Sequence, residues 1–258
     1  MNDQAAFALR GNILYSAGPD KIVSHPESWL VSEGGKVAGI FQELPEKYAR
    51  IPKEDFSGQL IIPGLVDLHL HAPQYSFRGL GMDLELLDWL ETNTFPEESK
   101  YRDLEYAAKA YQIFADALAK GATTRACVFA TVHTPATLML MDLLEQTGLN
   151  TLVGKVNMDR NCPENLLEQS ADISLKETQR WLEKCRDYKN TLPILTPRFI
   201  PSCTDELMAG LQEIRRETEL PVQSHLSENL SEVEWVKQLH PLTSCYGGAY
   251  DHFDLLRG

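Results

Sequence analysis

Residues 60–81 read LIIPGLVDLHLHAPQYSFRGLG, and this stretch decides the expected fold and site. An apolar run leads into His69 and His71, which stand two positions apart. Side chains two apart on a β-strand point to the same side, so both imidazoles can converge on one point at the strand's end, as a metal chelate requires. Pro63 and Gly64 interrupt the run near its start, where a strand tolerates them. Two nearby histidines are also common as ordinary surface residues, so the rest of the sequence has to decide between these interpretations.

The composition of the chain limits the class of protein and the partners that can be expected. The chain has 258 residues, of which 43% are hydrophobic, and this predicts a globular protein with a sizeable core. The net charge of -13 argues against a nucleic-acid or anionic-membrane partner, because both require a basic face. No stretch approaches the roughly 20 apolar residues that span a bilayer, and the N-terminus MNDQAAFALRG lacks the order of a signal peptide. Five cysteines without any C-x-x-C indicate reduced thiols. We therefore expect a cytoplasmic protein with a small-molecule ligand.

The sequence pattern changes after Gly58. Residues 7–56 alternate short apolar runs with turn residues and contain the hairpin signal Glu33-Gly34-Gly35-Lys36, which predicts antiparallel β-structure. Beyond it, strand-like runs alternate with helical patterns, which predict βαβ units and a parallel sheet. We expect a small β domain over residues 1–58 and a βα domain over residues 59–258. The strand-like runs of the second domain are IIPGLVDLHLH, TTRACVFATV, TLVGKVNM, LPILTPRFI and LPVQSHLSE.

Helical patterns with recognisable ends lie between these runs. An i, i+4, i+7 pattern over residues 104–118 predicts a helix that ends at Gly121. Thr134 is the expected N-cap of a second helix, with Gly148 as its end. Two further helices are expected to begin at capping boxes, Ser174-Leu175-Lys176-Glu177 and Ser231-Glu232-Val233-Glu234.

This alternation favours the (β/α)₈ barrel, in which catalytic residues lie at the carboxyl ends of the strands. Only five strand-like runs are found, whereas a closed barrel needs about eight strands and typically about 250 residues of its own. We therefore expect an incomplete barrel of about five βα units, in a chain truncated at its C-terminal side.

A third histidine stands at another expected strand end. The fifth run ends in QSHLSEN, with His225 followed three residues later by Glu228. Three imidazoles suit a catalytic zinc ion that keeps a position for water, so His69, His71 and His225 are the candidate ligands of one zinc ion. Glu228 is a candidate to take a proton from the metal-bound water and return it to a leaving nitrogen. A solvated loop carboxylate is the alternative interpretation of Glu228.

Three other side chains are candidates for contacts with a substrate. The fourth run ends in TPRFIPSC, which places Arg198 and Phe199 on the same rim. Arg198 could fix a carbonyl oxygen and Phe199 could wall a flat ring, although a rim arginine is commonly part of a structural ion pair. Gln74 offers both a donor and an acceptor, which suits a heterocycle with adjacent N–H and C=O groups. His133, His240 and His252 lack a partner at ligand spacing and are expected to be surface or structural residues.

These motifs resemble the metal-dependent amidohydrolases, with PGLVDLHLH similar to the first-strand metal motif and QSHLSE to the fifth. Within that superfamily, the chain from about residue 10 onward resembles the guanine deaminases. The blocks that carry this resemblance are HLHAPQYSFRGLGMDLELLDWL, TFPEE, GATTRACVFATVH, GKVNMD, LTPRFIPSC and QSHLSENLSEVEWV.

The resemblance implies zinc-dependent hydrolysis of guanine to xanthine and ammonia, with a metal-bound hydroxide as nucleophile and Glu228 as proton shuttle. It implies that one zinc ion is bound by His69, His71 and His225. It also implies that the purine is held by a set of five residues, Gln74, Arg198, Phe199, His225 and Glu228. For the full-length form it implies a homodimer.

The sequence lacks two residues of the family pattern, and this leads to two hypotheses about its function. The pattern requires a further histidine after the sixth strand and an aspartate after the eighth, and the sequence ends before both. The first hypothesis is therefore a guanine deaminase, or a sister amidohydrolase that deaminates another aminated heterocycle. The second is that this chain by itself is catalytically inactive and serves at most as a binding or interaction module.

Overall fold

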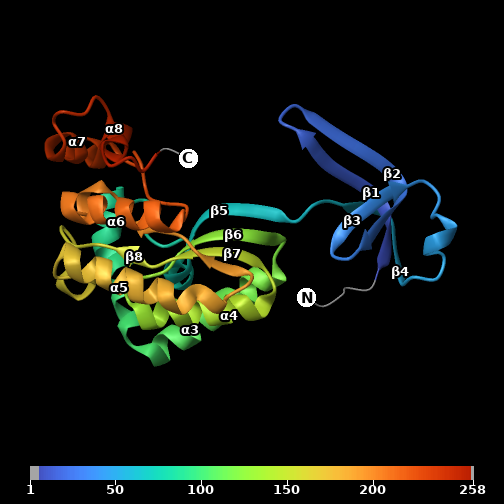
Figure 1. Ribbon diagram of the computed structural model, residues 1–258, viewed down its shortest axis with the longest axis horizontal. Helices are drawn as coiled ribbons and strands as arrows, with labels where there is room; N and C mark the ends of the chain where they lie inside the picture. The colour runs from blue at the N-terminus through green and yellow to red at the C-terminus, as the bar shows by residue number, and fades with distance from the viewer. Residues whose placement is uncertain (1–5, 257–258) are drawn as a thin grey trace. The chain divides into compact units, whose positions relative to one another are not determined.

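The computed structural model describes residues 6–256 (Figure 1). The chain divides into two compact units, one that ends at Gly64 and one that begins at Leu65. The boundary expected after residue 58 falls within β4 (Lys53–Ile61), whose last residues pair with the first strand of the first unit.

The first unit is a four-stranded sheet. Its order is β3-β2-β1-β4, and the antiparallel pairs β1·β2 and β2·β3 confirm the expected β-structure. Gly34 and Gly35 both have positive φ and close the hairpin that the sequence predicted. β4 differs, because it runs parallel to β1. The strands are β1 (Phe7–Gly18), β2 (Lys21–Glu33), β3 (Lys36–Phe41) and β4 (Lys53–Ile61).

The sequence suggested that the apolar run before His69 belongs to one strand, but the structure divides this run between two strands. β4 ends at Ile61 and β5 begins at Leu65, with Pro63 between them. Proline has no N–H to donate to a ladder, so the sheet of the first unit stops here and a new sheet starts. The strand that carries both histidines is therefore β5 (Leu65–His71) alone.

The second unit contains a parallel sheet, as expected for βα units. Its order is β5-β6-β7-β9, with the short parallel pair β8·β10 beside it. The fifth strand-like run forms a single bridge, from Val222 to Leu195, and the N–H of His225 donates to the Arg198 carbonyl at 3.1 Å. These contacts keep His225 at the same edge as β10. The remaining strands are β6 (Thr123–Phe129), β7 (Asn150–Gly154), β8 (Val156–Asn157), β9 (Thr191–Pro193) and β10 (Thr196–Pro197).

Helices α3, α4 and α5 lie along one face of this sheet (Figure 1). The core between them includes Trp181, Tyr111, Met141 and Val128, each fully buried. Within residues 6–256 no helix has the length and apolarity needed to cross a bilayer. The longer helices are α3 (Leu104–Lys120), α4 (Thr134–Thr147), α5 (Ala171–Lys184), α6 (Asp205–Thr218), α7 (Leu230–Leu239) and α8 (Tyr246–His252).

The helices expected from the sequence are present, but several of them begin at other residues than expected. α3 and α4 end at Gly121 and Gly148 as expected, but α4 begins at Thr134 itself. α5 begins three residues before the expected capping box, after the N-cap Ser170. Ser174 does not cap it, because its hydroxyl is buried and donates to Glu168. Similarly, α7 is capped by the Asn229 side chain, so the box expected at Ser231 was also wrong.

Candidate metal and substrate site

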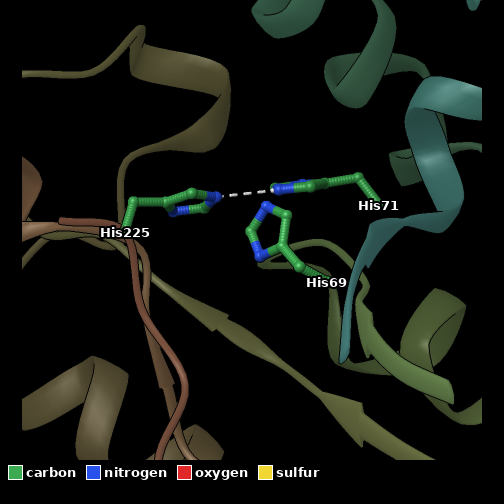
Figure 2. A group of neighbouring side chains, drawn as sticks. All are labelled: His69, His71 and His225. Atoms are coloured by element: carbon green, nitrogen blue, oxygen red, sulfur yellow. Dashed lines mark hydrogen bonds between the residues drawn. The ribbon is translucent and has the colours of Figure 1, made fainter. Parts of the chain in front are cut away.

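Three histidines from distant parts of the chain meet at the carboxyl ends of the strands. His69 and His71 end β5, and His225 follows the segment beside β10. The Nε2 atoms of His71 and His225 lie 2.9 Å apart, and one ring nitrogen of each histidine lies within 4.8 Å of the other two. Figure 2 shows the rings of His71 and His225 pointing at one another, with His69 beside the gap. The structure thus brings together the three candidate ligands.

The surroundings keep these imidazoles neutral. Burial, together with the charge of the nearby Arg198, lowers the pKa of His225 to about 3. Burial also lowers the pKa of His71 well below its usual value, with His225 and Arg198 acting in the same direction, and burial lowers the pKa of His69. A neutral imidazole presents a lone pair, whereas a protonated one does not. The three rings are therefore in the state that a metal ion requires.

A main-chain contact fixes the orientation of His225. Its Nδ1 lies 2.6 Å from the carbonyl oxygen of Arg198 and donates to it, since a carbonyl can only accept. Nε2 is left with its lone pair, facing His71. Metal-ligating histidines are commonly oriented in this way through the second ring nitrogen. The chemistry and geometry of the donor set thus fit a metal ion.

The Arg198 side chain is held by a buried ion pair. Its Nη1 lies 2.6 Å from Oε2 of Glu98, and only 3% and 1% of the two side chains are exposed. The guanidinium carbon lies 5.3 Å from the centre of the Phe95 ring. Arg198 therefore supports the histidine site through its main chain, while Glu98 and Phe95 fix its guanidinium group. The structural ion pair weighed from the sequence is found, and Arg198 also lines the cavity. Its contact with a substrate carbonyl oxygen stays a prediction.

A cavity of about 230 Å³ opens beside the histidines. Its polar lining includes Gln74, Arg198 and Glu228, and Phe199 contributes an aromatic wall. An apolar wall with a few fixed polar groups is the usual lining of a site for a small ring compound. The other apolar lining residues are Leu70, Leu86, Trp89 and Leu90.

Part of this wall comes from an irregular helical run. α1 (Leu86–Trp89) continues into a π-helical turn (Leu90–Thr94) and then into α2 (Phe95–Glu98). Such π-turns are rare and are found frequently at functional sites. Here the run places cavity-lining residues at one end and the partner of Arg198 at the other.

Glu228 lines the cavity and is partly exposed. Its Oε1 is 3.9 Å from Nε2 of His225, which is beyond hydrogen-bond distance, and 38% of the side chain is exposed. Burial of part of the group and the charge of Glu232 raise the pKa of Glu228, while Arg198 opposes the increase. A carboxyl group with a raised pKa is better suited to exchange protons near neutral pH. Glu228 and the three histidines line the same cavity.

Residues 60–253 match the model of the amidohydrolase family. The chain belongs to the amidohydrolase family. The family membership expected from the HLH and SHLSE motifs is therefore confirmed, as is the barrel type of its parallel sheet.

This amidohydrolase is similar to several guanine deaminases. It is 43% identical to the guanine deaminase of Dictyostelium discoideum over 204 residues, which are 78% of this chain and 45% of the relative. It is 39% identical to that of Homo sapiens over 238 residues, or 88% of this chain and 52% of the relative. A crystal structure of guanine deaminase from C. acetobutylicum with bound guanine in the active site matches 96% of this chain and 59% of its own, with a TM-score of 0.92 and 44% identity. The chain spans about half the length of the curated relatives it matches.

The sequence interpretation of this amidohydrolase missed two buried carboxylates. Glu98 and Glu232 are 1% and 0% exposed. The sequence does not show that either is buried, because the burial of an acid depends on tertiary packing. The one local signal is the placement of Glu98 in FPEE, two positions after a proline that follows an aromatic residue. Among residues 6–256, the only group of at least three possible metal-ligating side chains found is the histidine triad, so His133, His240 and His252 contribute to no such group.

Proposed function

We propose that the protein hydrolyses guanine to xanthine and ammonia with one zinc ion held by His69, His71 and His225. The observation that carries the proposal is the convergence of three neutral imidazoles beside a small cavity. Similarity to guanine deaminases over most of the chain, including a structure with bound guanine, supports this substrate.

Zinc, when bound, supplies a Lewis acid that makes water nucleophilic near neutral pH. The protein's part is to hold the ligands and to move protons. The Arg198 carbonyl keeps Nε2 of His225 turned toward His71. Glu228 accepts the proton that the attacking water loses and delivers it to the ring nitrogen. It then takes the proton of the hydroxyl group formed on the ring carbon and delivers it to the departing amine. Water thereby adds its oxygen to the ring carbon and the exocyclic nitrogen leaves as ammonia.

The cavity side chains match the polar edge of a purine. The Arg198 guanidinium can donate to a ring carbonyl oxygen, and its position is fixed by Glu98. The amide of Gln74 can both donate and accept, as an adjacent N–H and C=O pair requires. Phe199, which is 4% exposed, walls the ring. A cytoplasmic location and a homodimer stay predictions from the sequence and the family resemblance.

The proposal is tested by loading the chain with one equivalent of zinc and measuring xanthine and ammonia formed from guanine. His225→Ala should lose both bound zinc and turnover. His252→Ala, a change to an exposed histidine outside the cluster, should retain both. Turnover of a different aminated heterocycle without any turnover of guanine would move the substrate to that of a sister amidohydrolase. Stoichiometric zinc without turnover of either would support a chain that only binds.

A further inference from the structure

The loop that follows His225 is held by a buried carboxylate on α7. Glu232 is 0% exposed. Its Oε2 accepts the main-chain N–H of Glu228 at 2.8 Å, and its Oε1 accepts the hydroxyl of Tyr246 at 2.5 Å. Both oxygens of one buried side chain therefore serve as acceptors, one for the loop and one for α8.

The backbone of this loop needs such support. Ser227, directly before Glu228, has φ +57°, in the left-handed region that non-glycine residues rarely adopt. Strained conformations of this kind persist only where the surroundings determine them. The Asn229 side chain accepts the N–H of Glu232 at 3.0 Å and begins α7. Glu232 and Asn229 thus fix the turn on which Glu228 stands.

The other end of the loop, at His225, is held by α8. The hydroxyl of Tyr250 donates to the carbonyl oxygen of His225 at 2.6 Å and lies 2.7 Å from Oγ of Ser224. Tyr246 and Tyr250 are 5% and 3% exposed, and their rings stack at 5.9 Å with an interplanar angle of 5°. α8 therefore contacts the loop at two points, at the histidine directly and at Glu228 through Glu232.

We propose that Glu232, supported by Tyr246, is a positioning residue for Glu228, and that Tyr250 separately positions His225. The expected effect on catalysis rests on the proposed function, whereas the expected effect on the backbone of the loop does not. Glu232 holds the peptide N–H of Glu228 and not its carboxylate, so it sets where that carboxylate stands without contacting substrate or metal. Loss of Glu232 should then impair proton transfer and leave zinc bound. Loss of the Tyr250 hydroxyl should weaken zinc binding instead.

Glu232→Gln is the sharpest perturbation. The amide preserves the side-chain volume but removes the negative charge and turns one of the two accepting oxygens into an NH2 donor, so the main-chain N–H of Glu228 loses either its acceptor or the charge of that acceptor. Tyr246→Phe removes the hydroxyl that donates to Glu232. Tyr250→Phe makes the same change one helical turn away and is the matched control for the exchange of the Glu228 amide. All variants are compared with the unmodified 258-residue chain at one equivalent of zinc.

Three measurements separate positioning from general damage. Hydrogen exchange followed by mass spectrometry on peptides covering residues 226–229 reports the Glu228 amide. We expect about tenfold or faster exchange there in Glu232→Gln, a smaller increase in Tyr246→Phe, and none in Tyr250→Phe. Guanine kcat should fall about tenfold or more in Glu232→Gln with KM little changed. Zinc affinity, measured against a chromogenic chelator, should fall about 10–100-fold only in Tyr250→Phe.

Two results would overturn the inference. One is unchanged exchange of the Glu228 amide in both Glu232→Gln and Tyr246→Phe. The other is a loss of kcat that follows zinc loss in proportion, which would indicate a purely structural role. If the unmodified chain binds zinc but does not turn over guanine, the proposed function fails and the exchange data alone decide the inference. If Glu232→Gln does not fold, Tyr246→Phe provides the same test.

Discussion

Replacing Glu98 by alanine should strongly destabilise the second unit. The side chains of Glu98 and Arg198 are 1% and 3% exposed, and their charged atoms lie 2.6 Å apart. Removing one partner of a buried ion pair costs about 3–5 kcal/mol, because the remaining charge is left without a counter-charge or water. We expect the free energy of unfolding of the metal-free chain, measured by urea titration with tryptophan fluorescence, to fall by about this amount in Glu98→Ala.

A double variant distinguishes loss of a partner from loss of packing. Replacing a whole buried pair by apolar residues of similar volume is often neutral or stabilising by about 1–4 kcal/mol. Glu98→Leu combined with Arg198→Met should therefore be much more stable than Glu98→Ala. Glu105→Ala breaks an exposed pair with Lys109 and should cost less than about 1 kcal/mol. The reasoning is refuted if Glu98→Ala is as stable as the unmodified chain, or if the double variant is as unstable as Glu98→Ala.

Three further predictions concern the same unit. Burial lowers the pKa of His133 from 6.5 to about 4, so the fold favours its neutral form, and stability should fall as the pH drops from 6.5 toward 4. Urea midpoints across this range should vary less in His133→Asn, and an identical slope would contradict the assignment. In Gly154→Ala the new Cβ would lie 1.7 Å from Oγ1 of Thr196, and this overpacking should cost about 1–3 kcal/mol in urea titrations; unchanged stability would mean that the neighbouring strand moves freely. Gly148 has φ +74° with nothing within 4 Å of an added Cβ, so thermal and urea unfolding of Gly148→Ala should show only a left-handed strain of about 1–2 kcal/mol, and no loss would contradict that origin.

The parts of the site that local sequence rules govern were predictable. The period of two along a strand places His69 and His71 on one side, and strand ends of a parallel sheet share one edge. His225 could therefore be grouped with them although it stands 154 residues from His71. Arg198 and Phe199 were placed on the same rim by the same reasoning, and both line the cavity.

The parts that depend on tertiary packing were not predictable. Ser174 begins a sequence that looks like a capping box, but its hydroxyl bonds Glu168 and Asn157 in the interior, and the helix starts earlier at Ser170. The role of Glu232 was hidden in the same way, since its part in an apparent capping box says nothing of its contacts with Glu228 and Tyr246. The contacts of a side chain that bonds two elements depend on where those elements meet, and the local spacing of residues does not predict that.

The separation of the metal ligands also sets an order of events during synthesis. His69 and His71 leave the ribosome long before His225, which follows His71 by 154 residues. At translation rates of about 5–20 residues per second this interval is roughly 8–30 s. During that time two histidines alone offer a partial ligand set. Since a metal ion that binds only the folded state stabilises that state, binding by all three histidines would stabilise the second unit only after His225 has reached His69 and His71.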